Sequence, residues 1–398
     1  MAVGRLQSSW PLYADDEIAA VTEVLRSGRV NALHHGEWCS RLERGFAEFC
    51  GMPHALALAN GTVALELAMR ALGVGPGDEV IVPARSFFAS ASCIVAVGAT
   101  PVFADVDRAS GNLDPRSAAA SVTSRTRAIL PVHLAGWPCD MAALRRLCDE
   151  NHMLLIEDCA QAHGATFDGR PVGSFGDAAA FSFCTDKIIS TGGEGGLLLL
   201  RDEAAFERAW SYKDHGKDRA RTCAPAGGSQ FRWLHTSFGT NWRLTEMQAA
   251  IGTFQLARLR DWIEARQRNA EILTAALDGV PGVIVDRSAA NIGHARYKFY
   301  ARIDLDLHGG EGERDAIAAA IAAQGPFCGP GSCPEMYLED AVRGSPLQPP
   351  ERLANARELG RSSLMFQCDQ TLSPDVMTEI GAIAADVIGN WRSTRAAA

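Results

Sequence analysis

Between residues 54 and 200, short apolar segments alternate along the chain with amphipathic or polar ones. Segments that are apolar throughout are typical of strands buried on both faces of a parallel sheet. The segments 63–72 and 140–152 have helical periodicity instead, so they can cross from one strand to the next. Alternating strands and helices predict an α/β doubly wound fold. The seven apolar segments are 54–59, 79–84, 100–106, 127–134, 154–159, 178–183 and 196–200.

The last two apolar segments, 178–183 and 196–200, are joined by a polar, glycine-rich connection. It contains about a dozen residues, which is marginal for the helical crossover that parallel strands need. We therefore expect these two strands to be antiparallel. The sequence predicts a mostly parallel seven-stranded sheet with one antiparallel strand.

The C-terminal third of the chain has a different pattern. A long helical segment covers 245–277, followed by an expected strand at 298–305 and a helix at 313–324. We expect a large α/β domain over 1–258 and a smaller C-terminal α+β domain over 259–398.

Charge and composition exclude several classes of protein. The chain has 398 residues and a formal net charge of −9, which makes binding to nucleic acid or to an anionic membrane an unfavourable hypothesis. No signal peptide is recognised, and no run reaches the ~18 apolar residues of a membrane span. The 11 scattered cysteines form no CxxC pair, as expected of thiols in a reducing cytoplasm. The histidines lack HExxH spacing and the pair His34-His35 is interpreted as loop, so no metal site is predicted.

Asn60, Gly61 and Thr62 stand between an expected strand and an expected helix. Free backbone N–H groups, the helix dipole and the Thr62 hydroxyl would together make an anion site suited to phosphate. The alternative interpretation is that Thr62 only caps the helix.

Polar residues also stand at the carboxyl ends of two other expected strands. Asp158 follows Glu157 where open α/β sheets bind their ligands, and a carboxylate there needs a cation or several donors. The alternative is an Asp that caps the next turn. Ser182 and Lys187 end another strand, where a lysine can form a Schiff base with a carbonyl. The alternative for Lys187 is an ordinary surface lysine, and His163 is interpreted as a packing or hydrogen-bonding residue.

A phosphate site, a buried acid and a lysine at one edge of one sheet match the three groups of pyridoxal 5′-phosphate (PLP). Asp158 would keep the pyridine nitrogen protonated, and Lys187 would bind the aldehyde as a Schiff base. The glycines that follow Lys187 would let the loop turn tightly and bring its backbone close to the cofactor. These glycines are residues 192, 193, 195 and 196.

With these motifs in place, the chain resembles the DegT/StrS group of sugar aminotransferases, which are fold-type I PLP enzymes. The resemblance covers nearly the whole sequence. It rests on "YADDEIAAVTEVLRSGRV", "GDEVIVPARSFFASA", "VHLAGWPCDM", "EDCAQAHGA" and "GTNWRLTEMQAAIG".

The resemblance implies a role for each matching position. Lys187 would be the Schiff-base lysine and Asp158 the partner of the pyridine nitrogen, with Gln161 near the phenolic oxygen of the ring. Phe87 would stack on the ring, although a plain core aromatic is the alternative. Asn241 would reach the phosphate from the neighbouring subunit of a homodimer with shared active sites. Within one subunit the phosphate would be held by Gly61, Thr62 and Ser182.

The resemblance also implies a cytoplasmic transaminase that moves an amino group from an amino acid, glutamate in the family, to a small-molecule keto-sugar. A nucleotide-linked sugar of amino-sugar or surface-glycan biosynthesis, such as lipopolysaccharide, is expected. Glu194 follows Lys187 by seven positions, unlike the "KxxTxGEGG" loop of members that make aminocyclitols and aminohydroxybenzoate, and this mildly favours a nucleotide sugar. The alternatives are a cyclitol or other cyclic ketone as acceptor, or a non-catalytic regulatory protein with this fold.

Overall fold

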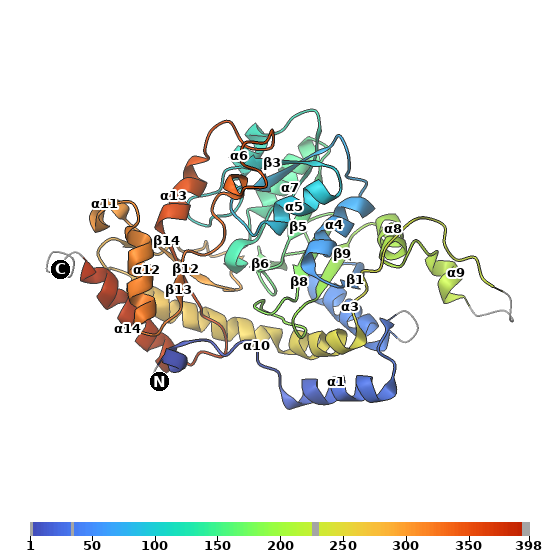
Figure 1. The fold of residues 1–398 in the computed structure, drawn as a ribbon, viewed down its shortest axis with the longest axis horizontal. Coiled ribbons are helices and arrows are strands. Elements are labelled where there is room, and N and C mark those ends of the chain that lie inside the picture. The colour runs from blue at the N-terminus through green and yellow to red at the C-terminus, as the bar shows by residue number, and fades with distance from the viewer. Residues whose placement is uncertain (1–2, 33–35, 225–230, 392–398) are drawn as a thin grey trace.

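A computed structural model describes residues 3–32, 36–224 and 231–391 and shows a large central sheet flanked by helices (Figure 1). The order of the seven strands in this sheet is β1-β9-β8-β5-β4-β2-β3. The strands are β1 (His54–Leu58), β2 (Glu79–Pro83), β3 (Thr100–Ala104), β4 (Thr126–Ile129), β5 (Leu154–Asp158), β8 (Ala178–Ser182) and β9 (Gly196–Leu200).

The last two strands of the sheet are antiparallel, as predicted, and β9 is the reversed one. It pairs antiparallel with β1 and with β8, in a register that sets Ser182 opposite Gly196. The pairs β8–β5, β5–β4, β4–β2 and β2–β3 are all parallel. The connection from β8 to β9 is too short to carry a crossover helix, so the chain returns beside the strand it has just left.

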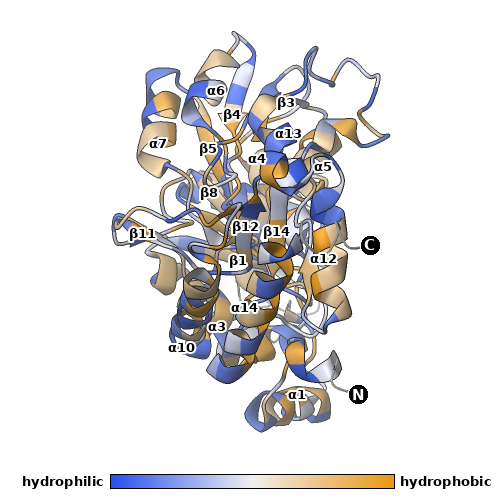
Figure 2. Cartoon of the chain, turned by 90° about the vertical axis from the view of Figure 1, so that its left-hand side faces the viewer, coloured by the Kyte–Doolittle hydropathy of each residue, from blue (hydrophilic) through white to orange (hydrophobic). Residues whose placement is uncertain are grey.

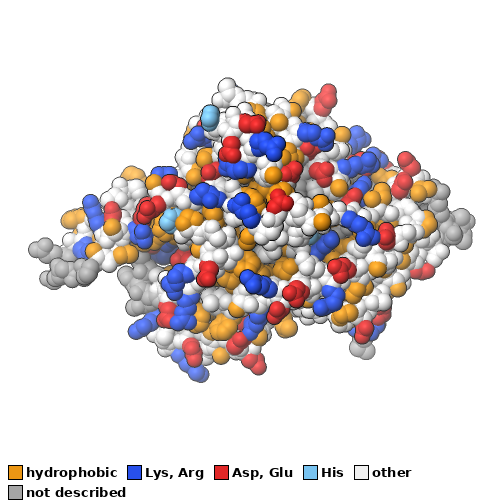
Figure 3. Space-filling view, turned by 180° about the vertical axis from the view of Figure 1, so that it is seen from behind, with side chains coloured by type: hydrophobic (Ala, Val, Ile, Leu, Met, Phe, Trp, Pro, Cys, Tyr) orange, Lys and Arg blue, Asp and Glu red, His pale blue; other side chains and the backbone are white. Residues whose placement is uncertain are grey.

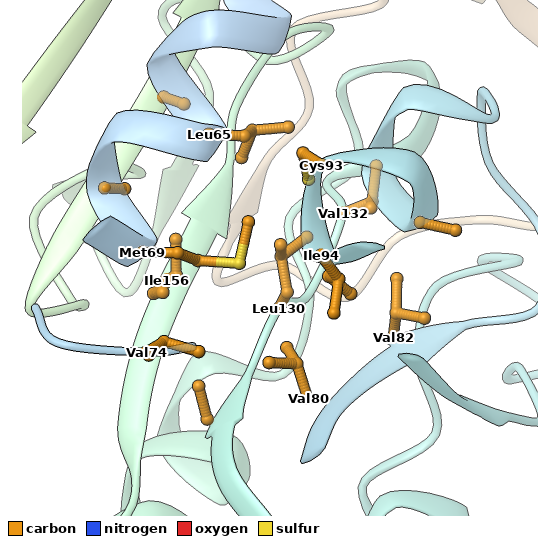
Figure 4. Packing of buried hydrophobic residues seen from close by; sticks show 14 of the residues in the cluster. Leu65, Met69, Val74, Val80, Val82, Cys93, Ile94, Leu130, Val132 and Ile156 are labelled. Carbon is orange, nitrogen blue, oxygen red and sulfur yellow. The ribbon is translucent and has the colours of Figure 1, made fainter. Parts of the chain in front are cut away.

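Helices cover both faces of this sheet, and successive residues of a strand therefore face different helices. In β9, Leu198 and Leu200 belong to the apolar cluster that contains Met69 of α4, whereas Leu197 packs with Phe46 of α3. Figure 4 shows the first of these clusters, in which side chains of α4 and α5 meet those of the strands. The predicted helices 63–72 and 140–152 are confirmed as α4 and α7. The helices before α10 are α1 (Asp15–Ser27), α3 (Glu37–Cys50), α4 (Gly61–Ala71), α5 (Ala89–Ala96), α6 (Pro115–Ala120), α7 (Met141–Glu150), α8 (Glu203–Lys213) and α9 (Arg219–Cys223).

The predicted long helix is confirmed as α10 (Glu246–Leu277), which begins with a capping box between Thr245 and Gln248. It leads to an antiparallel four-stranded sheet of order β10-β12-β14-β13. The expected strand at 298–305 and helix at 313–324 are confirmed there as β12 and α12. This part contains β10 (Val283–Ile284), β12 (Phe299–Ile303), α11 (Leu305–His308), α12 (Glu313–Ala323), β13 (Cys328–Gly329), α13 (Ala354–Ser362), β14 (Ser363–Phe366) and α14 (Pro374–Gly389).

The expected domain boundary after residue 258 falls inside α10, and it stays a prediction. Leu259 packs in the cluster under the large sheet, whereas Leu273 packs in the cluster of the C-terminal sheet, so the helix contributes to both. Leu6, from near the N-terminus, lies in the C-terminal cluster. Tyr337 and Leu359 pack in a cluster of the large sheet.

Small elements complete the described chain. They are the 3-10 helices Val3–Leu6, Leu134–Gly136 and Met336–Leu338, and a three-stranded sheet of β11 (Ile292–Gly293), β6 (Thr166–Phe167) and β7 (Arg170–Pro171).

The surface has no single dominant charge on the face seen in Figure 3, where acidic and basic side chains are interspersed. Figure 2 shows hydrophobic residues in the strands and in parts of the helices, where they alternate with hydrophilic ones. Across residues 3–32, 36–224 and 231–391, no helix has the length and apolar character to cross a membrane. All the cysteines are free thiols, and most are buried. The pair His34-His35 lies outside the described residues.

Candidate active site

A cavity of about 550 Å³ opens at the carboxyl ends of β1, β2, β5 and β8. The strand ends of the sheet bring most of the predicted site residues together there, although they come from segments far apart in the sequence. Asn241 is not among the described residues that line the cavity. The predicted residues in its wall are Gly61, Thr62, Phe87, Asp158, Gln161, Ser182 and Lys187.

The N-terminus of α4 forms one end of the cavity. Asn60 caps the helix, because its side chain accepts a hydrogen bond from the Val63 N–H at 2.9 Å. The alternative that Thr62 serves as the cap is therefore wrong, and the exposed Thr62 side chain faces the cavity. A Cβ on Gly61 would lie 2.7 Å from Cβ of Ser182, so only glycine lets the helix start approach β8 this closely. The helix end with its unpaired N–H groups and two hydroxyls fits a phosphate.

Asp158 forms the floor of the cavity and is buried. Its carboxylate accepts hydrogen bonds from the Ser90 hydroxyl at 2.8 Å and from the Ala160 N–H at 3.1 Å. Burial raises the pKa of Asp158, although these two bonds and the nearby charge of Lys187 oppose the rise. A cation facing this carboxylate would offset the cost of burying its charge, and a protonated pyridine nitrogen is such a cation.

Glu157 points to the opposite side of β5 and has another role. Its oxygens accept hydrogen bonds from the N–H groups of Gly173, Phe175 and Gly176 at 2.7–2.8 Å. Its carboxylate also lies 3.1 Å from Nε2 of His133, whose Nδ1 accepts from Cys139 N–H. His133, Glu157 and Cys159 bring potential metal ligands within 4.8 Å of one another. We interpret this cluster as a structural hydrogen-bond network, because those protein donors already engage the carboxylate.

Lys187 extends into the cavity with its side chain 15% exposed. The alternative of an ordinary surface lysine is therefore wrong. Nζ lies 3.7 Å from Oδ1 of Asp186 and 5.0 Å from the centre of the Tyr297 ring. The carbonyl of Lys187 accepts a 2.7 Å hydrogen bond from Trp10 Nε1. The chain has lysines only at 187, 213, 217 and 298, all in its described part, and Lys187 alone of these lines the cavity.

Two hydrogen bonds that the sequence motifs did not reveal lie next to Lys187 and Asp158. Tyr297 is buried, and its hydroxyl donates a hydrogen bond to the carboxylate of Asp186. This bond holds Asp186 beside Lys187. Ser86 and Ser90 share a hydrogen bond of 2.9 Å behind Asp158. The chain has few lysines, and this scarcity could have drawn attention to Lys187 from the sequence alone. No comparable signal marks Ser90 or Tyr297.

The glycine-rich loop after Lys187 turns tightly, as predicted. A Cβ on Gly195, where φ is +159°, would lie 2.2 Å from the Thr191 hydroxyl oxygen. A Cβ on Gly196 would meet the Asn60 carbonyl at 2.4 Å, so this glycine lets β9 pack against the start of α4. The loop therefore holds the start of α4 and Lys187 at the same cavity.

The remaining predicted residues lie at the mouth and side of the cavity. Phe87 is 68% exposed, so the alternative of a plain core aromatic is wrong, and its ring is available to a planar ligand. Gln161 accepts the Ala135 N–H at 2.7 Å, which leaves its amide N–H groups to donate to an oxygen of a ligand. His163 packs beside the rings of Phe181 and Phe183. Burial lowers the pKa of His163 to about 3, so this side chain is neutral near pH 7.

The cavity fits PLP in each of its parts: a phosphate cradle, an exposed aromatic face, a buried acid and one lysine. At this position in a sheet of this topology, these features define a fold-type I PLP-dependent enzyme. A model of the DegT/DnrJ/EryC1/StrS aminotransferase family matches residues 11–384. The chain belongs to this family and is a PLP-dependent aminotransferase.

Individual relatives agree with this assignment. The chain is 43% identical over 264 residues to a GDP-perosamine synthase of Caulobacter vibrioides, covering 66% of this chain and 68% of the relative. It is 40% identical over 283 residues to the 3-amino-5-hydroxybenzoate synthase of Amycolatopsis mediterranei, covering 69% of each. Among solved structures, an aminotransferase from Psychrobacter cryohalolentis superposes with a TM-score of 0.93 at 44% identity, covering 97% of this chain and 99% of that one.

Proposed function

We propose that this aminotransferase moves an amino group from glutamate to a nucleotide-linked keto-sugar. The single observation that carries the transaminase chemistry is one cavity that unites Lys187, Asp158 and the phosphate cradle at Gly61. The similarity to a GDP-perosamine synthase supports a nucleotide sugar as acceptor. We place the reaction in the cytoplasm, in the biosynthesis of amino sugars for surface glycans such as lipopolysaccharide.

The residues of the cavity would divide the work. When bound, PLP supplies an aldehyde that exchanges amino groups and a ring that accepts electrons. Asp158 would keep a proton on the pyridine nitrogen, and Gln161 would donate a hydrogen bond to the phenolic oxygen. Lys187 Nζ, once displaced by the donor amino group, would carry a proton from the substrate Cα to C4′ of the cofactor. Thr62 and Ser182 would hold the phosphate while Phe87 covers the ring.

A cyclitol or other cyclic ketone is the second candidate acceptor. The observation that favours it is the 40% identity to 3-amino-5-hydroxybenzoate synthase, close to the 43% for the perosamine enzyme. A non-catalytic regulatory role is disfavoured, because the chain retains the lysine and the acid that transamination requires.

A substrate screen tests the proposal. Cofactor-loaded enzyme is supplied with glutamate and with a panel of nucleotide-linked keto-sugars and unlinked cyclic ketones, and formation of 2-oxoglutarate is followed. We expect turnover with at least one nucleotide-linked sugar and much slower turnover with the unlinked ketones. Preference for an unlinked ketone would replace the proposal with the cyclitol alternative.

We also propose a homodimer in which each active site uses both chains. Asn241 is exposed and lies beside Asp214, outside the cavity of its own chain. The neighbouring segment 231–240 carries exposed aromatic side chains, of which Phe238 is 99% exposed. It adjoins α9, which projects from the body of the molecule (Figure 1). Exposed aromatics on a projecting segment are typical of an interface, so Asn241 could reach the phosphate of the partner.

Mixed dimers give a prediction for this arrangement. An Asn241→Asp carboxylate would repel the phosphate dianion, so that variant should bind PLP poorly. Paired with a Lys187→Ala chain, it leaves one site doubly damaged and the other wholly wild type. We expect purified heterodimers to have about half the activity of the wild-type dimer. If Asn241 serves its own chain, every site carries a lesion, and heterodimers no more active than either parent would refute sharing.

A further inference from the structure

A second, much smaller cavity lies between the large sheet and the C-terminal sheet. Its volume is about 40 Å³. Its wall is formed by the loops after β2, β3 and β4 on one side and by residues of 286–296, β12, α13 and β14 on the other. It adjoins the cofactor cavity through two links. Ala135 lines the small cavity while its N–H binds Gln161 of the large one, and Arg85 precedes Ser86, which lines the large one.

Arg85 is the unusual residue of this wall. Its side chain is buried, with 3% of the residue exposed, and no described Asp or Glu lies within ion-pair distance of it. Nη1 donates to the Ser363 hydroxyl at 3.0 Å, and the guanidinium lies 5.3 Å from the centre of the Tyr300 ring. Nε is buried without a hydrogen-bond partner. A buried cation that has neither a counter-ion nor a full set of acceptors is costly, so a missing anion is the simplest explanation.

The other ionisable residues of the wall leave it with a net positive charge. Arg296 is half-buried, and no hydrogen bond or ion pair of its side chain is found within the described residues. Arg302 pairs with Asp286 at 2.7 Å and lies 3.8 Å from Glu358. Asp286 is therefore already neutralised, and it is the single acid in the wall as the structure describes it. Burial lowers the pKa of His294, so this histidine adds no charge near pH 7.

The geometry points to a site for one carboxylate group, which we assign to the amino donor. Arginine binds carboxylates through paired N–H donors, and Arg85 and Arg296 are the two cations of the wall without a partner acid. A volume of about 40 Å³ accommodates a group of a few atoms, such as a carboxylate. The small cavity borders the cofactor cavity through Ala135 and Arg85, and on this adjacency we assign it to one carboxylate of a dicarboxylic amino donor. This assignment rests on the proposed transamination.

Glutarate is a suitable probe, because it has the two carboxylates of glutamate without the amino group. Its binding to the cofactor-loaded enzyme is measured by calorimetry and by the shift in unfolding temperature, at constant ionic strength. We expect Arg85→Gln to weaken binding at least about tenfold, since it removes a charged hydrogen-bond donor. Arg296→Gln, at a half-buried position, should weaken it as well and replaces the first variant if that one does not fold. The exposed Arg287, which pairs with Asp278, provides the control Arg287→Gln.

The glutarate measurements either support or overturn the assignment of a carboxylate site. Weaker glutarate binding in the Arg85 and Arg296 variants, with the Arg287 control unchanged, supports it. Unchanged glutarate binding in both variants overturns it. Stabilisation by chloride alone, with no effect of glutarate, means an adventitious inorganic anion and also overturns it. Because no turnover is needed, Arg85-dependent glutarate binding would remain even if the keto-sugar screen failed, so the two proposals can fail separately.

Discussion

Replacement of Lys187 by alanine is expected to reduce transamination by more than about four orders of magnitude and to leave the fold intact. The reason is that Lys187 is the sole lysine of the cavity and would supply both the bond to the cofactor and the base at the substrate Cα. Its Nζ makes only a weak ion pair with Asp186 at 3.7 Å, so little stability is lost with it. Steady-state rates and the visible absorbance of the loaded protein provide the measurement.

Lys187→Arg is the matched control, because arginine keeps the positive charge but does not form the Schiff base. We expect it to be as inactive as the alanine variant. Borohydride reduction of the wild type should attach the cofactor to the peptide that contains Lys187. Near wild-type rates in either variant would end the assignment of this lysine.

Asp158→Asn should give the second-largest loss, about two to four orders of magnitude in kcat, with only a modest loss of bound cofactor. An asparagine cannot stabilise a protonated pyridine nitrogen through charge, so the ring accepts electrons less well. A tenfold change corresponds to about 1.4 kcal/mol in the barrier, so this loss is well above that of a minor packing change. Single-turnover kinetics with glutamate measure it.

The stability of the cofactor-free protein provides a control for this variant. Burial raises the pKa of Asp158 in the folded protein. Between the pKa of the unfolded chain and this higher pKa, the folded protein keeps a proton that the unfolded chain has lost, so the free energy of unfolding falls as pH rises. Asparagine avoids this cost, and the unfolding temperature of the cofactor-free variant at neutral pH should stay near that of the wild type. Activity within about threefold of wild type would leave Asp158 with a structural role only.

The fold was predictable from the sequence where elements carry their own signals. The strand β9 is reversed because the loop before it is too short, and α10 begins where Thr245 and Gln248 form a capping box. The helix α5 escaped prediction, since its eight residues are small or apolar almost throughout and show no helical alternation of polar and apolar positions. The two-residue strands of the C-terminal part, such as β13, are likewise too short for a pattern.

The candidate site was predictable where its residues sit in contiguous motifs. The strand ends bring Thr62, Asp158 and Lys187 into one cavity because parallel strands share an edge. Contacts across long sequence distances were not predictable. Tyr297 is 111 residues from Asp186, and nothing in its local sequence reports that bond. The sequence also allowed Thr62 to cap α4, whereas Asn60 is the capping residue. Both residue types are good caps, and only the backbone geometry distinguishes them.

The central claim is that this cavity transfers amino groups through a cofactor bound at Lys187. The most direct test mixes cofactor-loaded enzyme with glutamate and no acceptor, and follows the visible spectrum together with the 2-oxoglutarate released. We predict a spectral change and about one 2-oxoglutarate per active site, followed by return of the spectrum when a keto-sugar nucleotide is added. The Lys187→Ala protein should show neither change. Absence of 2-oxoglutarate from the wild type, or its equal release by the Lys187→Ala variant, would contradict the account.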